Sequence, residues 1–267
     1  MSYEQKISRT KPGLIVLVLD DSGSMADNLP GTSDPKYQWV ERYVGNILEE
    51  LLSRSSDVKG EGVVIKPRYY LYVLKYGSDT DLWGNGEMDI EAAVELFSNS
   101  GNSLGLGGHL GGTDAEKALR QMYDYLTQAL AGERFKDSFP AMLLHLSDGE
   151  SNTDATEAAQ QIMDISTNDG NVLMVNAYIG TQTSLSYTGP GDFPGYIDVT
   201  EAGPSDDNIH LFNMSSVAPD SILDNLKADS IFPKIRPGSR LFFDVRTKDM
   251  LKNCLQVVGS MGSRMAR

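Results

Sequence analysis

Cysteine and histidine are scarce in this chain. One cysteine, Cys254, and three histidines stand among 267 residues. A single cysteine cannot close an internal disulfide, and scattered histidines do not give the ligand spacing of a zinc site. The cysteine count agrees with a reducing compartment. His145 and His210 fall within predicted strands, so we expect them to be hydrogen-bonded structural residues.

Long apolar runs and excess positive charge are also missing. The longest apolar run, residues 14–19, is far too short to cross a bilayer, and residues 1–12 lack the apolar core of a signal peptide. We therefore expect a cytoplasmic protein with no membrane partner. The 23 basic and 37 acidic residues give a net charge of −14, which repels phosphate backbones. We expect no nucleic-acid partner.

Apolar runs and helical periodicities alternate along the chain. Strands are predicted at residues 13–19, 68–76, 81–83, 139–146, 171–179 and 209–214. Helices are predicted at residues 39–52, 91–97, 118–130, 154–165 and 250–258. This alternation predicts an α/β, doubly wound, Rossmann-like fold with a mostly parallel central sheet flanked by helices. Ligands of such sheets bind at the carboxyl ends of the strands.

The predicted domain occupies residues 13–260, between an N-terminal extension at 1–12 and a tail at 261–267. Within it, residues 181–208 are rich in Gly, Pro, Ser and Asp, and we expect a functional excursion or a mobile loop without regular structure. Residues 215–246 are predicted to be irregular. Cys254 shares the apolar face of the last helix, so we expect it to be buried.

Polar side chains follow three of the predicted elements at the expected binding edge. These segments are Asp20-Asp21-Ser22-Gly23-Ser24, Gly112-Thr113-Asp114 and Ser147-Asp148-Gly149. Hard divalent cations take oxygen ligands, and a set of hydroxyls with only two carboxylates suits Mg²⁺ or Mn²⁺ better than Ca²⁺. The sequence therefore predicts a metal site made by Asp20, Ser22, Ser24, Thr113 and Asp148.

The same residues carry a family resemblance. Asp20-x-Ser22-x-Ser24, then a GGT-type Thr113, then a strand-terminal Asp148 resembles the metal-ion-dependent adhesion site of von Willebrand factor A domains of the bacterial intracellular type. The resemblance implies that the serines ligate the metal directly, that the aspartates act directly or through water, and that the threonine binds when a partner engages.

The resemblance also implies a function. It predicts a non-enzymatic protein-interaction module whose Mg²⁺ or Mn²⁺ binds an acidic side chain of a partner protein. Intracellular bacterial proteins of this kind accompany ATPases, or kinase and phosphatase pairs, in stress-response or metal-resistance systems.

Each site residue also has a purely structural interpretation. Thr113 and Glu116 form a capping-box pattern, Ser22 and Ser24 can cap a turn or helix, and Asp148 begins a common Asp-Gly turn. A metal that only ties loops together would make the protein a scaffold.

One enzyme class stays open as an alternative. Asp20, Thr113, Lys117 and Asp148 loosely resemble the set of a Mg²⁺-dependent phosphohydrolase of the haloacid dehalogenase type, but Ser22 stands where that family has a second acid. An ATPase is disfavoured, because the Gly-rich stretch 101–112 lacks the Gly-Lys-Ser/Thr ending of a phosphate-binding loop. We expect that stretch to be mobile.

Overall fold

A mostly parallel sheet organises the computed structural model, which describes residues 3–29, 31–59, 62–149, 151–180 and 185–260. The strands lie in the order β5-β4-β1-β7-β8-β9, and β6 also pairs with β4. The parallel strands are β1 (Gly13–Asp20), β4 (Tyr69–Tyr76), β7 (Met142–Ser147), β8 (Leu173–Tyr178) and β9 (Phe242–Asp244). The short β5 (Thr80–Leu82) and β6 (Met88–Asp89) run antiparallel to β4. The predicted α/β architecture is confirmed.

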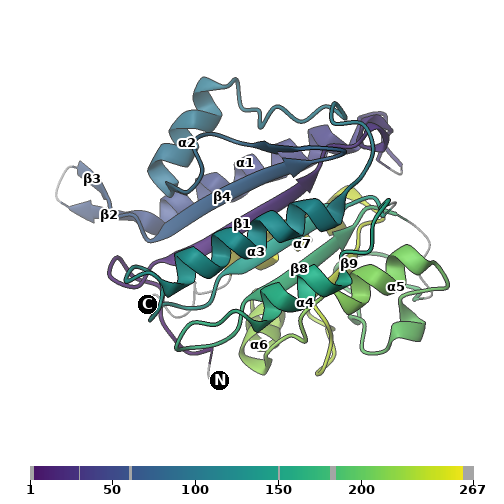
Figure 1. Cartoon of the computed structure of the whole chain (residues 1–267). Helices are drawn as coiled ribbons and strands as arrows, with labels where there is room; N and C mark the ends of the chain where they lie inside the picture. The colour runs from purple at the N-terminus through teal and green to yellow at the C-terminus, as the bar shows by residue number, and fades with distance from the viewer. Residues whose placement is uncertain (1–2, 30, 60–61, 150, 181–184, 261–267) are drawn as a thin grey trace.

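Helices cover both faces of this sheet (Figure 1). One face carries α1 (Lys36–Ser55), α6 (Asp220–Ala228) and α7 (Lys248–Ser260). The other carries α3 (Ala115–Ala131), α4 (Thr156–Asp164) and α5 (Asp206–Asn213). Helix α2 (Ile90–Asn99) packs against α1 and β4. In the described part of the chain, none of these helices is long and apolar enough to span a membrane.

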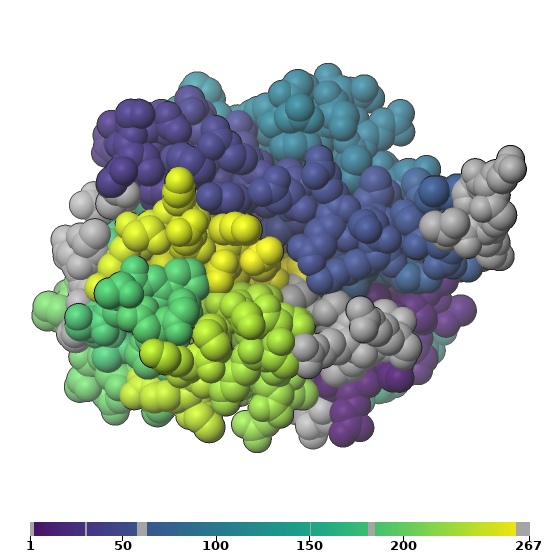
Figure 2. Space-filling view, turned by 180° about the vertical axis from the view of Figure 1, so that it is seen from behind, coloured from purple at the N-terminus to yellow at the C-terminus, as the bar shows by residue number. Residues whose placement is uncertain are grey.

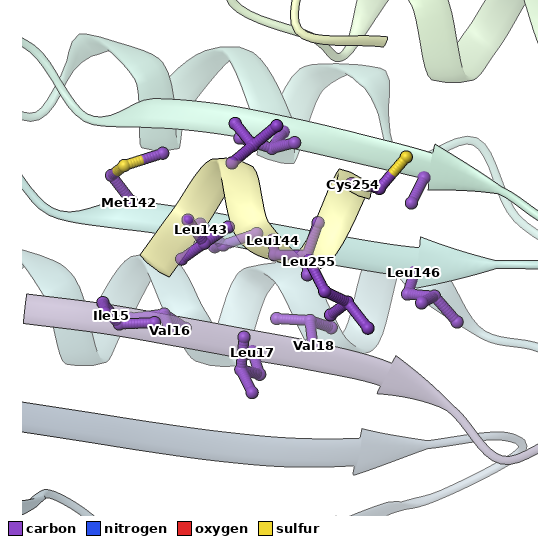
Figure 3. Close-up of a cluster of buried hydrophobic side chains, with 14 of the residues drawn as sticks. Ile15, Val16, Leu17, Val18, Met142, Leu143, Leu144, Leu146, Cys254 and Leu255 are labelled. Atoms are coloured by element: carbon purple, nitrogen blue, oxygen red, sulfur yellow. The ribbon is translucent and has the colours of Figure 1, made fainter. Parts of the chain in front are cut away.

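The core lies where α7 packs over the central strands. All residues of β1 and β7 are buried, as expected for strands whose alternate side chains meet helices on opposite faces. Figure 3 shows Leu255 of α7 lying over the aliphatic side chains of β1 and β7, with Cys254 beside β8. Cys254 is fully buried, and burial raises the pKa of its thiol well above the ordinary value. Its predicted packing role is confirmed.

The C-terminal third corrects two expectations. Residues 209–214 are predicted as the last strand, but residues 209–213 belong to helix α5 and Met214 is its C-cap; Leu211 and Phe212 are buried, and His210 lies in the last turn. The sheet instead ends with β9, inside the segment 215–246 that was predicted to be irregular and that also contains α6. Strand β9 is only 3 residues long, too short to show a strand periodicity.

Most of the predicted long loop is packed against the domain. Residues 181–184 lie outside the described part of the chain; the rest includes the short 3₁₀ helix η2 (Val199–Glu201) and the start of α5. Phe193 and Tyr196 are fully buried, and the Phe193 ring centroid lies 5.0 Å from that of Phe232. Seen from behind, residues near 190–200 lie beside α6 and α7 (Figure 2). The segment is thus part of the core.

A buried carboxylate anchors this packed segment. Asp244, at the end of β9, is fully buried. Its Oδ1 accepts hydrogen bonds from Tyr187 Oη at 2.5 Å and Tyr196 Oη at 2.6 Å, and its Oδ2 pairs with Arg246 Nε at 2.6 Å. Both oxygens are therefore occupied by donors from the long segment and from the strand end.

An antiparallel hairpin extends away from the sheet (Figure 1). It consists of β2 (Ser56–Lys59) and β3 (Gly62–Ile65), directly after α1. Val63 and Val64 on β3 are exposed. Neither strand of this hairpin is among the strands predicted from the sequence.

Candidate metal site at the carboxyl edge of the sheet

Asp20 ends β1, and the 3₁₀ helix η1 (Gly23–Ala26) follows almost at once. Its carboxylate is held from two sides: Oδ1 accepts the Ser22 amide at 2.8 Å, and Oδ2 accepts the Ser147 hydroxyl at 2.8 Å. Because Ser147 ends the neighbouring strand β7, this pair joins the ends of two strands. The Asp20 side chain is therefore fixed in the floor of the site.

The electrostatics of Asp20 favour a nearby cation. The pKa of Asp20 is raised from 3.8 to about 6, mainly by burial and also by the negative charge of Asp148, against hydrogen bonds from Ser22 and Ser147 that lower it. Two carboxylates close enough to repel each other in a buried place cost free energy unless positive charge is added.

The two serines after Asp20 place their hydroxyls together. Ser22 Oγ and Ser24 Oγ are 3.2 Å apart. Ser22 stands at the N-cap position of η1, but its side chain makes no capping hydrogen bond within the described chain. A capping role for Ser22 is therefore wrong, and its lone pairs are available to a ligand.

Thr113 approaches the same place from the third segment. The helix after it is capped by Asp114, whose Oδ1 accepts the Lys117 amide at 3.0 Å, so the capping-box interpretation of Thr113 is wrong. Thr113 is nearly buried, and its carbonyl accepts the Asn152 amide from the loop that follows Asp148, at 2.8 Å. The threonine segment is thereby tied to the Asp148 loop.

Asp148 lies just beyond β7 with its two oxygens in different states. Oδ2 pairs with the ammonium of Lys36 at 2.9 Å. Oδ1 is buried and, among the described residues, has no hydrogen-bond partner. Buried carboxylate oxygens are nearly always satisfied, so this oxygen is the position in the site where a cation or a water would fit.

Gly149 keeps the Asp148 turn close to the sheet. Its φ is +108°, in the region that favours glycine, and a Cβ there would lie 2.5 Å from the ring of Tyr178 on β8. The Asp-Gly pair is thus a real turn, as its structural interpretation predicted, and it also presents Asp148 to the site.

The Gly-rich stretch beside the site is held by carboxylates. Asp21 Oδ1 accepts the amides of Gly107 and Gly108, both at 2.7 Å, and Glu41 Oε1 accepts two more loop amides. A further bond, from the Gly23 amide to the Gly111 carbonyl at 2.9 Å, joins the loop to η1. These contacts give no support to the expected mobility.

Sequence reasoning missed two residues of the site. Ser147 holds Asp20, and its position directly before Asp148 was the available signal. Lys36, the first residue of α1, donates to Asp148 Oδ2 and, at 3.2 Å, to the Ser24 carbonyl. Nothing in the local pattern around Lys36 indicates a partner 112 positions away.

A buried polar chain runs beneath the site. Tyr76 Oη and His145 Nε2 are 2.7 Å apart, His145 Nδ1 and Asn176 Oδ1 are 2.8 Å apart, and Asn176 Nδ2 donates to Ser215 Oγ at 3.0 Å. Burial lowers the pKa of His145 to about 4, so the ring is neutral near pH 7. The prediction of a hydrogen-bonded structural histidine is confirmed for His145.

The donor set fits a hard divalent cation. In the part of the chain that the structure describes, no three His, Cys, Asp or Glu side chains cluster as a metal site would require. A cation here would instead depend on hydroxyls from Ser22, Ser24 and Thr113 beside the carboxylates of Asp20 and Asp148. Neutral hydroxyls with two carboxylates are ligands that Mg²⁺ and Mn²⁺ accept, with water in the remaining positions.

The comparisons with known proteins rest on solved structures, because no family model and no curated protein matches this chain. A von Willebrand factor type A protein from Catenulispora acidiphila matches with 15% identity and a TM-score of 0.50, over 94% of this chain and 43% of that one. A mutant of the PilB minor pilin from Streptococcus sanguinis matches with 7% identity and a TM-score of 0.55, over 96% of this chain and 62% of that one. The chain thus spans less than two thirds of either structure.

A third match is weaker. The manganese-loaded TRAP protein of Plasmodium vivax is 17% identical, with a TM-score of 0.40, over 67% of this chain and 59% of that one. At that score the likeness has no weight for the metal site. The sheet order, the helices on both faces and the match to the Catenulispora acidiphila structure agree, and this chain has the fold of a von Willebrand factor A domain.

Proposed function

We propose that this chain is a non-enzymatic protein-interaction domain that docks its partner through a bound Mg²⁺ or Mn²⁺. Asp20, Ser22, Ser24, Thr113 and Asp148 would hold the cation. The observation that carries the proposal is the buried Oδ1 of Asp148, which has no hydrogen-bond partner among the described residues, beside a second buried carboxylate whose pKa is raised to about 6. A cation would satisfy the first and stabilise the charged form of the second.

The ligand types indicate what such a cation would bind next. Three of the five ligands are neutral hydroxyls, so water would remain exchangeable on the cation, and the two carboxylates would only balance its charge of +2. With the ammonium of Lys36, which pairs with Asp148, the occupied site would carry a net charge of +1. A carboxylate from a partner would replace a water and neutralise that charge in one step. The chain's net charge of −14 repels an acidic partner at long range, so the attraction is confined to the metal and depends on it.

Two observations favour binding over phosphoryl chemistry. Lys117, which the phosphohydrolase alternative needs at the site, has its ammonium 2.8 Å from Asp79 Oδ1, and its side chain is 49% exposed. Position 22 carries a hydroxyl in place of the second acid. The catalytic set of that alternative is thus incomplete in both chemistry and placement.

The first experiment is a titration with Mn²⁺ by calorimetry. We expect one ion per chain in the unaltered protein and none in an Asp20→Ala, Asp148→Ala double variant. Undiminished binding in the double variant would refute the site.

The second experiment is affinity capture of partners in Mg²⁺ and in chelator, followed by Asp→Asn and Glu→Gln changes in the captured partner. We expect chelator, or the loss of one partner carboxylate, to abolish the complex. If chelator lowers only the melting temperature and leaves partner binding unchanged, the metal is structural and the domain is a scaffold. The captured proteins also test the expected association with ATPases or kinase and phosphatase pairs.

A further inference from the structure

The ammonium of Lys36 lies inside the group of residues that would hold the metal. It contacts Asp148 Oδ2 at 2.9 Å and the Ser24 carbonyl at 3.2 Å, and both residues belong to the ligand set. The side chains of Lys36 and Asp148 are only 13% and 5% exposed, so water screens this pair poorly. The backbone of Lys36 is anchored by the hydrogen bond that its amide N–H donates to the Asp27 carbonyl, at 2.9 Å.

The charges of the site explain what this ammonium does without metal. Asp20 and Asp148 place two negative charges in a buried site, and the ammonium of Lys36 neutralises one of them. It pairs with Oδ2 of the Asp148 carboxylate, while Oδ1 has no hydrogen-bond partner in the part of the chain that the structure describes. The metal-free site is thereby half-neutralised but keeps an open oxygen.

We propose that Lys36 is a resident counter-ion that competes with the divalent cation for Asp148. It stabilises the site when metal is absent and weakens metal binding when metal is present. This inference rests on the proposed function, because it concerns the same cation. A site weakened in this way depends on a partner's carboxylate for full occupancy, since that carboxylate offsets the added positive charge.

The size of the effect follows from Coulomb's law. A unit charge about 6 Å from a divalent ion changes the affinity by roughly tenfold even at the dielectric constant of bulk water, about 80, and by more at the lower effective value of a poorly screened site. Replacing Lys36 by a neutral side chain of similar length should therefore tighten Mn²⁺ binding by about tenfold or more.

The test compares Mn²⁺ affinity, measured by calorimetry, among the unaltered protein, Lys36→Met, Lys36→Arg and Lys66→Met. Lys66 pairs with Asp57 near the opposite end of α1, so Lys66→Met makes the same change in net charge far from the site. We expect tighter binding only in Lys36→Met, because Lys36→Arg keeps the local charge. Unchanged or weaker binding in Lys36→Met would overturn the proposal; weaker binding would mean that Lys36 positions Asp148 for the metal.

A second readout is the melting temperature in chelator and in saturating Mn²⁺. We expect Lys36→Met to melt lower than the unaltered protein in chelator, and Mn²⁺ to remove the difference; an equal melting temperature in chelator would contradict the counter-ion role. If Lys36→Met fails to fold, Lys36→Gln takes its place in both measurements. The two proposals fail separately: if neither the unaltered protein nor the Lys36 variants bind Mn²⁺, both are wrong, whereas binding that Asp20→Ala abolishes and Lys36→Met leaves unchanged refutes only the role of Lys36.

Discussion

Two aspartates at the carboxyl edge of the sheet have opposite surroundings. Asp244, ending β9, has donors on both oxygens, from Tyr187, Tyr196 and Arg246. Asp148, just after β7, has Lys36 on one oxygen and, within the described chain, nothing on the other. A carboxylate with all its donors in place stabilises a fold, whereas one with a buried open oxygen costs free energy until a ligand arrives.

The groups around the two carboxylates also differ: those near Asp244 donate hydrogen bonds, and those near Asp148 can offer lone pairs. Around Asp244 the polar groups are a guanidinium and phenol hydroxyls that already donate to it, set among the rings of the packed segment. Around Asp148 are serine and threonine hydroxyls and a second carboxylate, all able to present lone pairs to a cation. One end of the edge is thus closed to a metal and the other is suited to it.

The largest effect is expected when the Asp244 carboxylate, which has donors on both oxygens, is removed. Asp244→Ala removes the buried carboxylate that accepts from Arg246 Nε and from two tyrosine hydroxyls, so we expect the free energy of unfolding to fall by about 3 to 5 kcal/mol. Urea denaturation measures this loss, and thiol labelling of the fully buried Cys254 should accelerate with it. Mn²⁺ affinity should stay unchanged in the folded fraction; a loss of metal binding would mean that the two ends are coupled.

The next test uses pH in the absence of metal. Asp20 has a folded pKa of about 6 against 3.8, so its contribution to stability is present below pH 3.8 and is lost as pH rises through 6. His145 has a folded pKa of about 4 against 6.5, so its contribution is present above pH 6.5 and is lost as pH falls through 4. Each residue changes the free energy of unfolding by about 3 kcal/mol across its pH range. The two contributions change in opposite directions over nearly the same pH range.

Single variants should separate these slopes in chelator. With Asp20→Asn, the free energy of unfolding should rise steadily from pH 4 to 6.5, because of these two residues only His145 still titrates. With His145→Gln, the free energy of unfolding should fall over that range, because of the two only Asp20 still titrates. The measurement is urea denaturation at a series of pH values, and parallel curves for both variants would contradict the assignment.

A smaller effect separates adjacent residues of the third segment. Asp114 caps α3 through the Lys117 amide, so Asp114→Ala should cost roughly 1 kcal/mol of unfolding free energy. Thr113→Ala removes no cap and should cost less, yet it should weaken the metal-dependent complex more than Asp114→Ala does. Thermal melts and partner affinity in Mg²⁺ provide the comparison; the reverse order in both would restore the capping interpretation of Thr113.

The smallest expected change comes from Lys117. Its ammonium pairs with Asp79 at the surface, where an ion pair contributes little. Lys117→Ala should leave Mn²⁺ affinity and the melting temperature unchanged within error. Loss of Mn²⁺ binding would bring this lysine back into the site and revive the phosphohydrolase alternative.

The central strands and the metal-site segments could be predicted from the sequence for physical reasons. Strands β1 and β7 are buried on both faces, so their sequences are continuous apolar runs. Each run ends at polar residues of the candidate site. Parallel strands bring such ends to one edge. The convergence of Asp20 and Ser147 follows from that topology, and their hydrogen bond shows it directly.

The errors occur where local pattern and tertiary position diverge. Residues 209–214 alternate enough to resemble a strand, but residues 209–213 lie in an 8-residue helix whose buried residues are Asn208, Leu211 and Phe212, and Met214 is its C-cap. Strand β9 owes its place to pairing with β8, which no 3-residue window can show. The contact of Lys36 with Asp148 joins residues 112 positions apart, so it needs the folded chain to be seen.

The carboxylate anchors of the Gly-rich loop have a consequence for the kinetics of association. Asp21 and Glu41 hold the loop amides before any partner arrives, so little backbone freedom remains to be lost on binding. A partner would contact a loop that already has its binding conformation, so association would be close to rigid-body docking and would involve little folding of the loop. Differences in affinity between partners should then appear mainly in how long they stay bound.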